Sequence, residues 1–207
     1  MSKRVLNLPV LVLSVFSIIA LGLLFSFIYL SVNGNDYTNV YLEKIQSGEI
    51  KNPIKSLGLI LSEEEVSEEY QVIELEGGKK IIIKSQNVGE LSITDIEKAS
   101  IEYASVLLKF YNLHNVPFTS ITPKIQIYID DNPYYAEVIG GEIIVEGGES
   151  ESADVIIRTT NEEMFKMNDD ETYARESFSS GASQFEKVAN DFILFSKGYL
   201  SLYNEFS

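Results

Sequence analysis

The hydrophobic residues of this chain are distributed very unevenly, beginning with an uncharged stretch near the start. No charged residue occurs between Arg4 and Asp36, and residues 8–32 are 25 mostly apolar positions. As an α-helix they would measure roughly 37 Å, enough to cross the hydrocarbon core of a bilayer with some tilt. The apolar part of a cleaved signal peptide is usually about 7–15 residues long and ends in a small-x-small site, which this stretch lacks. We therefore predict a retained transmembrane anchor within residues 1–35, with residues 8–32 in the bilayer.

The charges that flank this stretch predict its orientation. Lys3 and Arg4 precede it, and Asp36 is the first charge after it. The positive-inside rule places the N-terminus in the cytoplasm and everything after residue 35 outside the cell membrane. Beyond residue 35, 14 basic residues stand against 31 acidic ones, a net charge of −17. Anionic lipid headgroups repel a part of the chain that is this acidic. We therefore expect it to stay in the water unless one of its faces docks specifically on the membrane.

Two short segments lead from the anchor to the main domain. Residues 36–70 hold a weak helical pattern, a break at Gly48 and Pro53, and a run of glutamates over residues 63–69. The run lacks a glycine-punctuated calcium loop, so we interpret residues 36–70 as an acidic, self-repelling stalk. Residues 71–93 contain two apolar runs around Gly77-Gly78, which predicts a β-hairpin with a tight turn.

Residues 94–207 combine helical and strand periodicities and predict one α+β domain. Apolar residues recur every three or four positions from Asp95 to His114, after a capping box that we assign to Thr94 and Glu97. Four strand-like runs follow between short turns, and they cover residues 124–129, 134–139, 142–146 and 154–159. Short strands at this spacing predict an antiparallel meander. A second capping box, Thr160 with Glu163, predicts a short helix through Met167, and residues 172–190 predict another helix, interrupted near Gly181.

The C-terminal end carries an apolar stripe of heptad type. Its members are spaced alternately by three and four positions: Phe185, Val188, Phe192, Phe195, Tyr199, Leu202 and Phe206. A helix with this stripe would pack on the domain's own sheet, or bind a partner protein or a membrane. A break at Gly198 is the alternative to a continuous helix, because glycine costs a helix interior about 1 kcal/mol.

Composition and charge exclude several classes of function. The chain has a net charge of −15, one histidine and no cysteine. Without cysteine there is no disulfide scaffold, thiolate metal site or cysteine nucleophile, and a single histidine does not build a conventional zinc site. So acidic a chain is not expected to bind nucleic acid. We interpret His114, at a helix end, and the acidic pairs Asp130-Asp131 and Asp169-Asp170, in turns, as structural. No catalytic motif occurs, so we expect no enzyme activity, no metal and no cofactor.

One stretch resembles a known family. Residues 124–167 combine a glycine-turned meander, a strand that opens with Ala153-Asp154, and a helix that starts at residues 160–163 and carries Met164, Phe165 and Met167. In these features, and in the order of elements over residues 94–207, the chain resembles the sterol carrier protein type 2 (SCP2) family. The resemblance implies a five-stranded sheet and helices that enclose an apolar tunnel, and binding of fatty-acyl or sterol-like lipids without catalysis. In place of the family's glycine- and lysine-bearing segment this chain has Ser180-Gly181-Ala182. In place of the final strand it has the helically spaced residues 192–195, and without that strand an open tunnel is not expected.

Carried over by position, the resemblance implies a ligand site. The inward residues of the sheet and of the helices over it would line this site: Ile127, Ile129, Ile157, Met164, Phe165, Met167, Phe178, Phe192 and Phe195. Methionine and phenylalanine suit such a lining because their side chains adapt to an apolar ligand of variable shape. The same residues would equally fill an ordinary solid core.

These observations predict an α+β protein in which an N-terminal single transmembrane helix is followed by an antiparallel sheet covered by helices. Its expected function is to bind a lipid or another apolar ligand outside the cell membrane, without catalysis. The alternative is a membrane-anchored interaction or assembly subunit with a solid core, which binds a partner protein through the C-terminal stripe.

Overall fold

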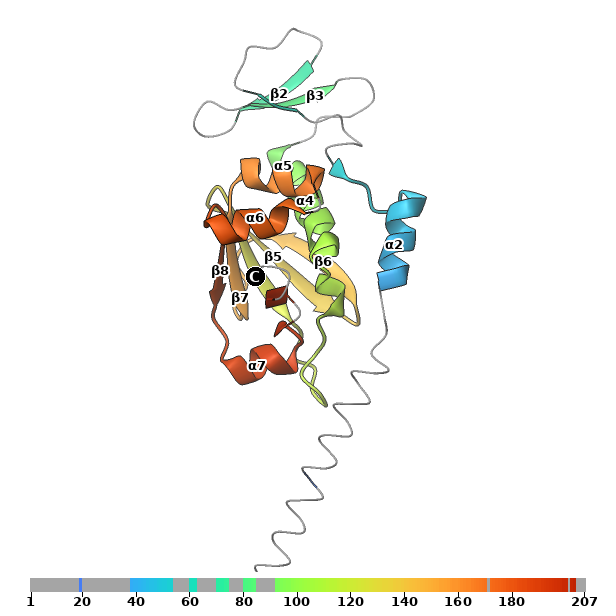
Figure 1. The fold of residues 1–207 in the computed structure, drawn as a ribbon, viewed down its shortest axis with the longest axis vertical. Coiled ribbons are helices and arrows are strands. Elements are labelled where there is room, and N and C mark those ends of the chain that lie inside the picture. The colour runs from blue at the N-terminus through green and yellow to red at the C-terminus, as the bar shows by residue number, and fades with distance from the viewer. Residues whose placement is uncertain are drawn as a thin grey trace, which may run out of the picture. The chain divides into compact units, whose positions relative to one another are not determined.

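The computed structural model describes residues 19, 38–53, 60–62, 70–74, 80–84, 92–170, 172–200 and 202–203, and Figure 1 draws its fold. The chain divides after Asp36 into two units, and Tyr37–Ser207 is the unit described below. The predicted transmembrane stretch, residues 8–32, lies outside the described residues except for Ile19. Among the described residues, no helix combines the length and the apolar character that crossing a membrane requires.

The centre of this unit is a five-stranded sheet in the order β6-β5-β4-β7-β8. Strands β4 (Lys124–Ile129), β5 (Asn132–Ile139) and β6 (Glu142–Gly147) form the antiparallel meander that the turn residues predict. Strand β7 (Val155–Thr159) instead pairs parallel to β4, with Val155 opposite Ile125. Strand β8 (Gln184–Lys187) pairs antiparallel with β7 at the edge. The domain is α+β as predicted, but the prediction of a purely antiparallel sheet is wrong, because residues 148–154 carry the chain past β5 and β4 to the far side of the meander.

A buried amide holds this crossing connection in place. Alternate residues of a strand point to opposite faces of the sheet. Ile125, Ile127 and Ile129 belong to the apolar core, so Gln126 lies on the other face. Gln126 is 3% exposed, donates to the Gly148 carbonyl and accepts from the Ser150 N–H at 2.7 Å. Because a buried amide needs such partners, this side chain fixes the connection that makes β7 parallel to β4.

Helices α4 (Ile93–Leu107), α5 (Asn161–Asp169) and α6 (Tyr173–Ser180) pack on the apolar face of the sheet (Figure 1). Helix α4 begins at a capping box made by Ser92 and Asp95, and not by the predicted pair Thr94 and Glu97. It also ends well before the predicted end at His114, since Lys109 adopts a left-handed φ of 59° and a 3₁₀ turn, η2 (Phe110–Asn112), follows. Helix α5 begins at Thr160, whose hydroxyl accepts from the Glu163 N–H as predicted.

Glu97, which the sequence analysis assigned to the capping box of α4, has a different role. Glu97 is 1% exposed and accepts hydrogen bonds from the Tyr134 hydroxyl and from Asn161 Nδ2, the latter at 2.8 Å. Burial and the Glu97 carboxylate raise the pKa of Tyr134, so its hydroxyl stays protonated and keeps donating. This buried contact joins α4, β5 and the start of α5.

The C-terminal part is not one continuous helix, and it is broken at the two glycines that the sequence analysis named, Gly181 and Gly198. Helix α6 ends where Gly181 adopts a φ of 80°, and strand β8 begins at Gln184. Helix α7 (Asp191–Ser196) follows, and the chain turns again at Gly198, at a φ of 86°. The predicted stripe is therefore divided between a strand, a short helix and a final turn, and reading it as one helical face is wrong. The expectation that no strand follows β7 is also wrong, because β8 completes a five-stranded sheet.

Two elements precede the main domain along the chain. A small sheet of order β1-β3-β2 contains β1 (Ile60–Ser62), β2 (Tyr70–Glu74) and β3 (Lys80–Lys84). Strands β2 and β3 pair antiparallel, as the hairpin prediction requires, and β1 is an addition that the sequence analysis did not foresee. In the segment predicted as a stalk, helix α2 (Thr38–Ser47) contacts the domain through Tyr41. This ring stacks on Tyr111, with centroids 4.8 Å apart, and its hydroxyl donates to the Gly141 carbonyl at 2.8 Å.

Candidate functional site

An apolar cavity lies between the sheet and the helices. Its walls come from β4, β7, α4, α5, α6 and the start of η2, through these residues: Ile101, Ala104, Ser105, Leu108, Phe110, Ile127, Ile157, Thr159, Met164, Met167 and Phe178. Its volume is about 20 Å³, room for roughly one water molecule, whereas small-molecule pockets usually measure about 300–1,000 Å³. In this conformation the side chains fill the layer almost completely.

The structure brings some of the predicted ligand-site residues together and separates others. Ile129 and Phe165 are buried, at 0% and 6% exposure, but do not line the cavity. Phe192 and Phe195 are 73% and 44% exposed on α7, which departs from their predicted place in the lining. These two side chains are exposed because α7, which follows β8, lies beyond the end of the sheet and does not cover its apolar face. The other five line the cavity: Ile127, Ile157, Met164, Met167 and Phe178.

The sequence analysis missed the part of the wall that α4 supplies. Ile101, Ala104 and Leu108 line the cavity at helical spacing. The apolar spacing over residues 95–114 instead gave a stripe of five residues, of which Phe110 lines the cavity, Ile96 and Tyr103 are buried, and Ala99 and Leu107 are only partly buried. Two neighbouring stripes of one helix have the same period, so periodicity alone did not choose between them.

Two hydroxyl groups belong to the otherwise apolar wall. Ser105 is 1% exposed, and its Oγ has no hydrogen-bond partner among the described residues. Thr159 begins a line of buried hydroxyls, in which its Oγ1 lies 2.7 Å from Ser183 Oγ and Ser177 Oγ lies 2.8 Å from the same atom. Ser177 then donates to Glu163 Oε2 at 2.7 Å. A polar line therefore connects one wall of the cavity to a carboxylate on α5.

That carboxylate joins α5 to α6. Burial alone would raise the pKa of Glu163, but hydrogen bonds from Ser177, Lys166 and Tyr173 outweigh burial and lower it. Lys166 Nζ lies 3.1 Å from Glu163 Oε1, and the Tyr173 hydroxyl donates to Oε2 at 3.1 Å. Glu163 is therefore ionised at neutral pH and holds the two helices over the cavity through hydrogen bonds to Tyr173 and Ser177.

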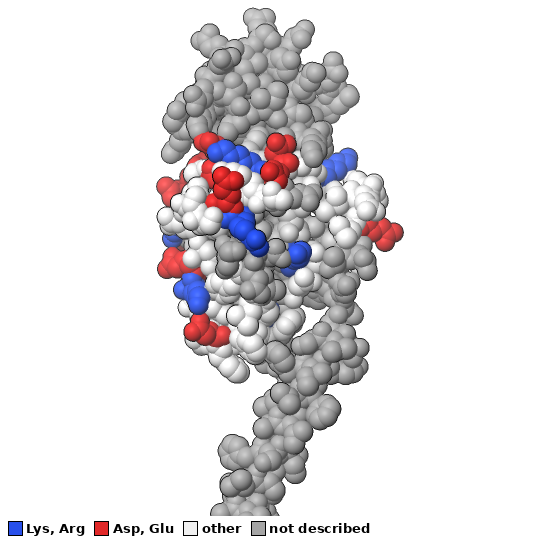
Figure 2. Space-filling view, in the orientation of Figure 1, with Lys and Arg blue, Asp and Glu red and all other residues white. Residues whose placement is uncertain are grey.

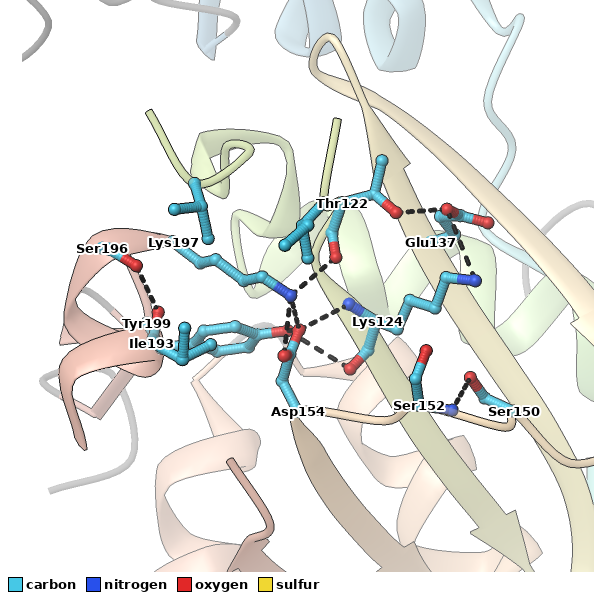
Figure 3. A network of polar contacts seen from close by, with 12 residues as sticks. Thr122, Lys124, Glu137, Ser150, Ser152, Asp154, Ile193, Ser196, Lys197 and Tyr199 are labelled. Carbon is cyan, nitrogen blue, oxygen red and sulfur yellow. Dashed lines mark hydrogen bonds and ion pairs between the residues drawn. The ribbon is translucent and has the colours of Figure 1, made fainter. Parts of the chain in front are cut away.

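A second, polar hollow lies at the end of the sheet where β4 and β7 begin (Figure 3). Its volume is about 320 Å³, and it is lined by Ser120, Ile121, Thr122, Lys124, Ser152, Asp154, Ile193 and Lys197. An ion pair lies beside it: Lys197 Nζ is 2.7 and 2.8 Å from the two carboxylate oxygens of Asp154 and donates to the Thr122 carbonyl at 2.7 Å. The two charged side chains are 3% and 6% exposed.

Further hydrogen bonds complete this ion pair. The Asp154 carboxylate accepts from the Lys124 N–H at 2.8 Å and from the Tyr199 hydroxyl at 3.0 Å. Burial and the neighbouring carboxylate raise the pKa of Tyr199 well above its usual value, so its hydroxyl stays protonated and donates. The network ties together the segments before β4, before β7 and after α7 (Figure 3). Because the ammonium and both carboxylate oxygens have partners, we interpret the network as a structural clip. We call it the Lys197 clip.

The described residues contain no cluster of three or more His, Asp or Glu side chains arranged to hold a metal ion. The histidine, His114, lies with its Nδ1 3.1 Å from the Asn115 carbonyl oxygen, in an exposed position.

No family model matches the chain, and neither does any curated protein. Among solved structures the chain is similar to one described as "UbiJ-SCP2 Ubiquinone synthesis protein". The two are 13% identical, the match covers 57% of this chain and 98% of the other, and the TM-score is 0.31.

Proposed function

We propose that this chain is a membrane-anchored protein whose domain binds an apolar ligand without catalysing a reaction. The observation that carries the proposal is the chemistry of the cavity wall, in which nine of the eleven lining side chains are apolar and the other two are hydroxyls. Ser105 supplies a buried hydroxyl with no partner among the described residues, and such a group gains free energy when a ligand oxygen pairs with it. A long hydrocarbon with one oxygen-bearing group, as in a fatty-acyl or sterol-like lipid, matches this wall.

Binding requires side chains to move, because the cavity measures only about 20 Å³. Met164 and Met167 are suited to this, since each has three rotatable bonds and a polarisable thioether. Phe178 is only partly buried and lies on α6, a helix of eight residues that ends at Gly181. We expect α6 and Phe178 to move outward as the ligand enters, while the hydrogen-bonded strands β4 and β7 stay in place.

Photo-crosslinking tests this function on the full chain in membranes. Cells that produce the chain are given palmitate bearing a diazirine, irradiated, and the labelled peptides are mapped by mass spectrometry. We expect labelling of α5 and α6, and its loss in Met164→Trp, which fills the cavity. Phe165→Trp is the matched control, because Phe165 is the adjacent buried residue and does not line the cavity. Labelling confined to residues 8–32, or equal labelling of both variants, would contradict the proposal.

The anchor is the other half of the proposal, and its support is the uncharged apolar run of residues 8–32. We propose that the N-terminus is cytoplasmic and the domain lies outside the cell membrane. The chain should therefore stay with the membrane through an alkaline carbonate wash, and protease added to intact cells should digest the domain. Release by carbonate would refute the anchor, and protection from protease would refute the orientation.

The small cavity favours a second candidate function, a solid-core subunit that binds a partner protein. Organic-solvent extraction of the purified full chain followed by mass spectrometry separates the two functions. A lipid recovered in near-stoichiometric amount supports ligand binding, and repeated empty preparations support the interaction subunit.

A further inference from the structure

A group of exposed apolar side chains lies at the end of the domain where β4 and β7 begin. We call this surface the basal face, and its members are Phe118, Ile121, Val188, Phe192, Phe195 and Leu200, between 44% and 85% exposed. They come from the loop before β4, the residue that follows β8, α7 and the turn after α7. These segments adjoin, because Ile121 and Ile193 line the same hollow and the His114 N–H donates to the Lys197 carbonyl at 3.1 Å. Figure 1 shows α7 at this end of the sheet.

The most exposed member occupies a backbone position that favours glycine. The Thr119 N–H donates to the Val116 carbonyl at 3.1 Å and closes a four-residue turn with Pro117 in its second position. Phe118, the third residue, has a φ of 64°, as in a type II turn, and its side chain is 85% exposed. The left-handed backbone of a non-glycine residue lowers stability here, and the exposed ring gains no free energy from burial as long as it lies in water. Contact with an apolar medium would bury the ring and supply that free energy.

Strand direction places the start of helix α2 at the same end of the domain. Strand β5 runs antiparallel to β4, so the turn at Gly140-Gly141 lies where β4 begins. Tyr41, in the first turns of α2, donates to the Gly141 carbonyl at 2.8 Å. Only residues 33–37 separate the apolar run 8–32 from α2, and five extended residues span at most about 18 Å. If residues 8–32 lie in a bilayer, this end of the domain is therefore held close to its surface.

The charges of the domain indicate how it would meet that surface. On the side shown in Figure 2, charged side chains gather over the upper part of the domain, and its lower end, where α7 lies in Figure 1, carries few. The part of the chain after residue 35 has a net charge of −17, so attraction to anionic headgroups cannot hold it there. Exposed aromatic and aliphatic side chains can, because they partition into the interfacial region of a bilayer.

We infer that the basal face rests on the lipid–water interface of the membrane that holds residues 8–32, with Phe118 and Phe192 inserted. The inference depends on the proposed anchor, and its occupant is the bilayer and not a protein.

Single-tryptophan variants of the full chain test the inference, because the natural sequence contains no tryptophan. Phe118→Trp and Phe192→Trp are reconstituted into phosphatidylcholine vesicles, with and without bromine on the acyl chains. We expect both variants to lose most of their emission in brominated vesicles. Tyr128→Trp is the control, since Tyr128 lies near the other end of β4, and its emission should be unaffected.

Vesicle flotation separates a failed anchor from failed docking. A chain that does not float with the vesicles overturns the anchor and the docking together. A chain that floats but whose Phe118→Trp and Phe192→Trp emission is not quenched overturns the docking alone. Emission that shifts to the blue only as protein density rises would show that a second copy covers the face, and it would also overturn the inference.

Discussion

Removing the ammonium group of Lys197 should destabilise the domain far more than removing an exposed lysine. Lys197→Met keeps an unbranched side chain but removes the positive charge. The Asp154 carboxylate, which is 6% exposed, then keeps only its hydrogen bonds from the Lys124 N–H and the Tyr199 hydroxyl. Breaking a buried ion pair by removing one partner costs about 3–5 kcal/mol, because the remaining charge is buried without compensation. For a domain of this size, such a loss lowers Tm by on the order of 10 °C.

The assay is urea unfolding of the full chain in mild detergent, followed by far-UV circular dichroism. Lys187→Met is the matched control, since Lys187 pairs with Asp191 at 3.3 Å with both side chains more than half exposed. An exposed pair of this kind contributes about 0–1 kcal/mol. Lys197→Met combined with Asp154→Leu should recover much of the lost stability, because apolar residues often replace buried ion pairs at little cost. If Lys197→Met costs no more than Lys187→Met, the reasoning about the Lys197 clip is refuted.

Three further predictions concern the turns and the helix ends. Thr160→Ala removes the hydroxyl that caps α5 and should lower the free energy of unfolding by about 1 kcal/mol. The same urea titration measures this loss, and an unchanged midpoint would show that the cap does not stabilise the domain. The folded state lowers the pKa of Glu163 below its ordinary value of 4.5, so the ionised group adds stability above that pH and loses it as the pH falls through the folded pKa. Glu163→Gln should therefore flatten the acid side of the stability–pH curve, and an unchanged acid slope would show that Glu163 has no part in it. Gly198→Ala should destabilise the domain more than Gly181→Ala. Both glycines have a left-handed φ, which costs alanine about 1–2 kcal/mol, but only at Gly198 would the added Cβ meet other atoms, His114 Nε2 at 3.3 Å and the Asn112 carbonyl oxygen at 3.4 Å. Equal losses of stability in thermal unfolding would refute this difference.

The local elements of the fold could be read from the sequence. The turns at Asp130-Asp131 and Gly140-Gly141 separate β4, β5 and β6 as the sequence predicted, and Thr160 predicted the start of α5, because turns and caps depend on residues close together in the chain. The parallel pairing of β7 could not be read, since alternation shows which residues of a strand face the core but not which strand lies beside it. Strand β8 was also missed, because Phe185 is the one apolar residue in its four positions.

The residues of the two sites also divide into those whose burial follows a local pattern and those whose position depends on the tertiary structure. Ile127, Ile157 and Met164 were assigned to the ligand site by position, from the SCP2 resemblance, and their burial follows the local periodicity of β4, β7 and α5. Phe192 and Phe195 have the same spacing but lie on a short helix beyond the sheet, so their exposure depends on where β8 ends. The pairing of Lys197 with Asp154 joins residues 43 positions apart, and no pattern within either segment indicates it.

The Lys197 clip also bears on when the domain can complete its folding. The meander β4-β5-β6 pairs residues that are close in the chain, so it can form as soon as Gly147 has left the ribosome. The ammonium that joins the segments before β4 and β7 belongs to Lys197, which is synthesised 50 positions after Gly147. Until Lys197 has left the ribosome as well, the buried Asp154 carboxylate has no counter-charge from it. The Lys197 clip therefore closes later in synthesis than the meander can form.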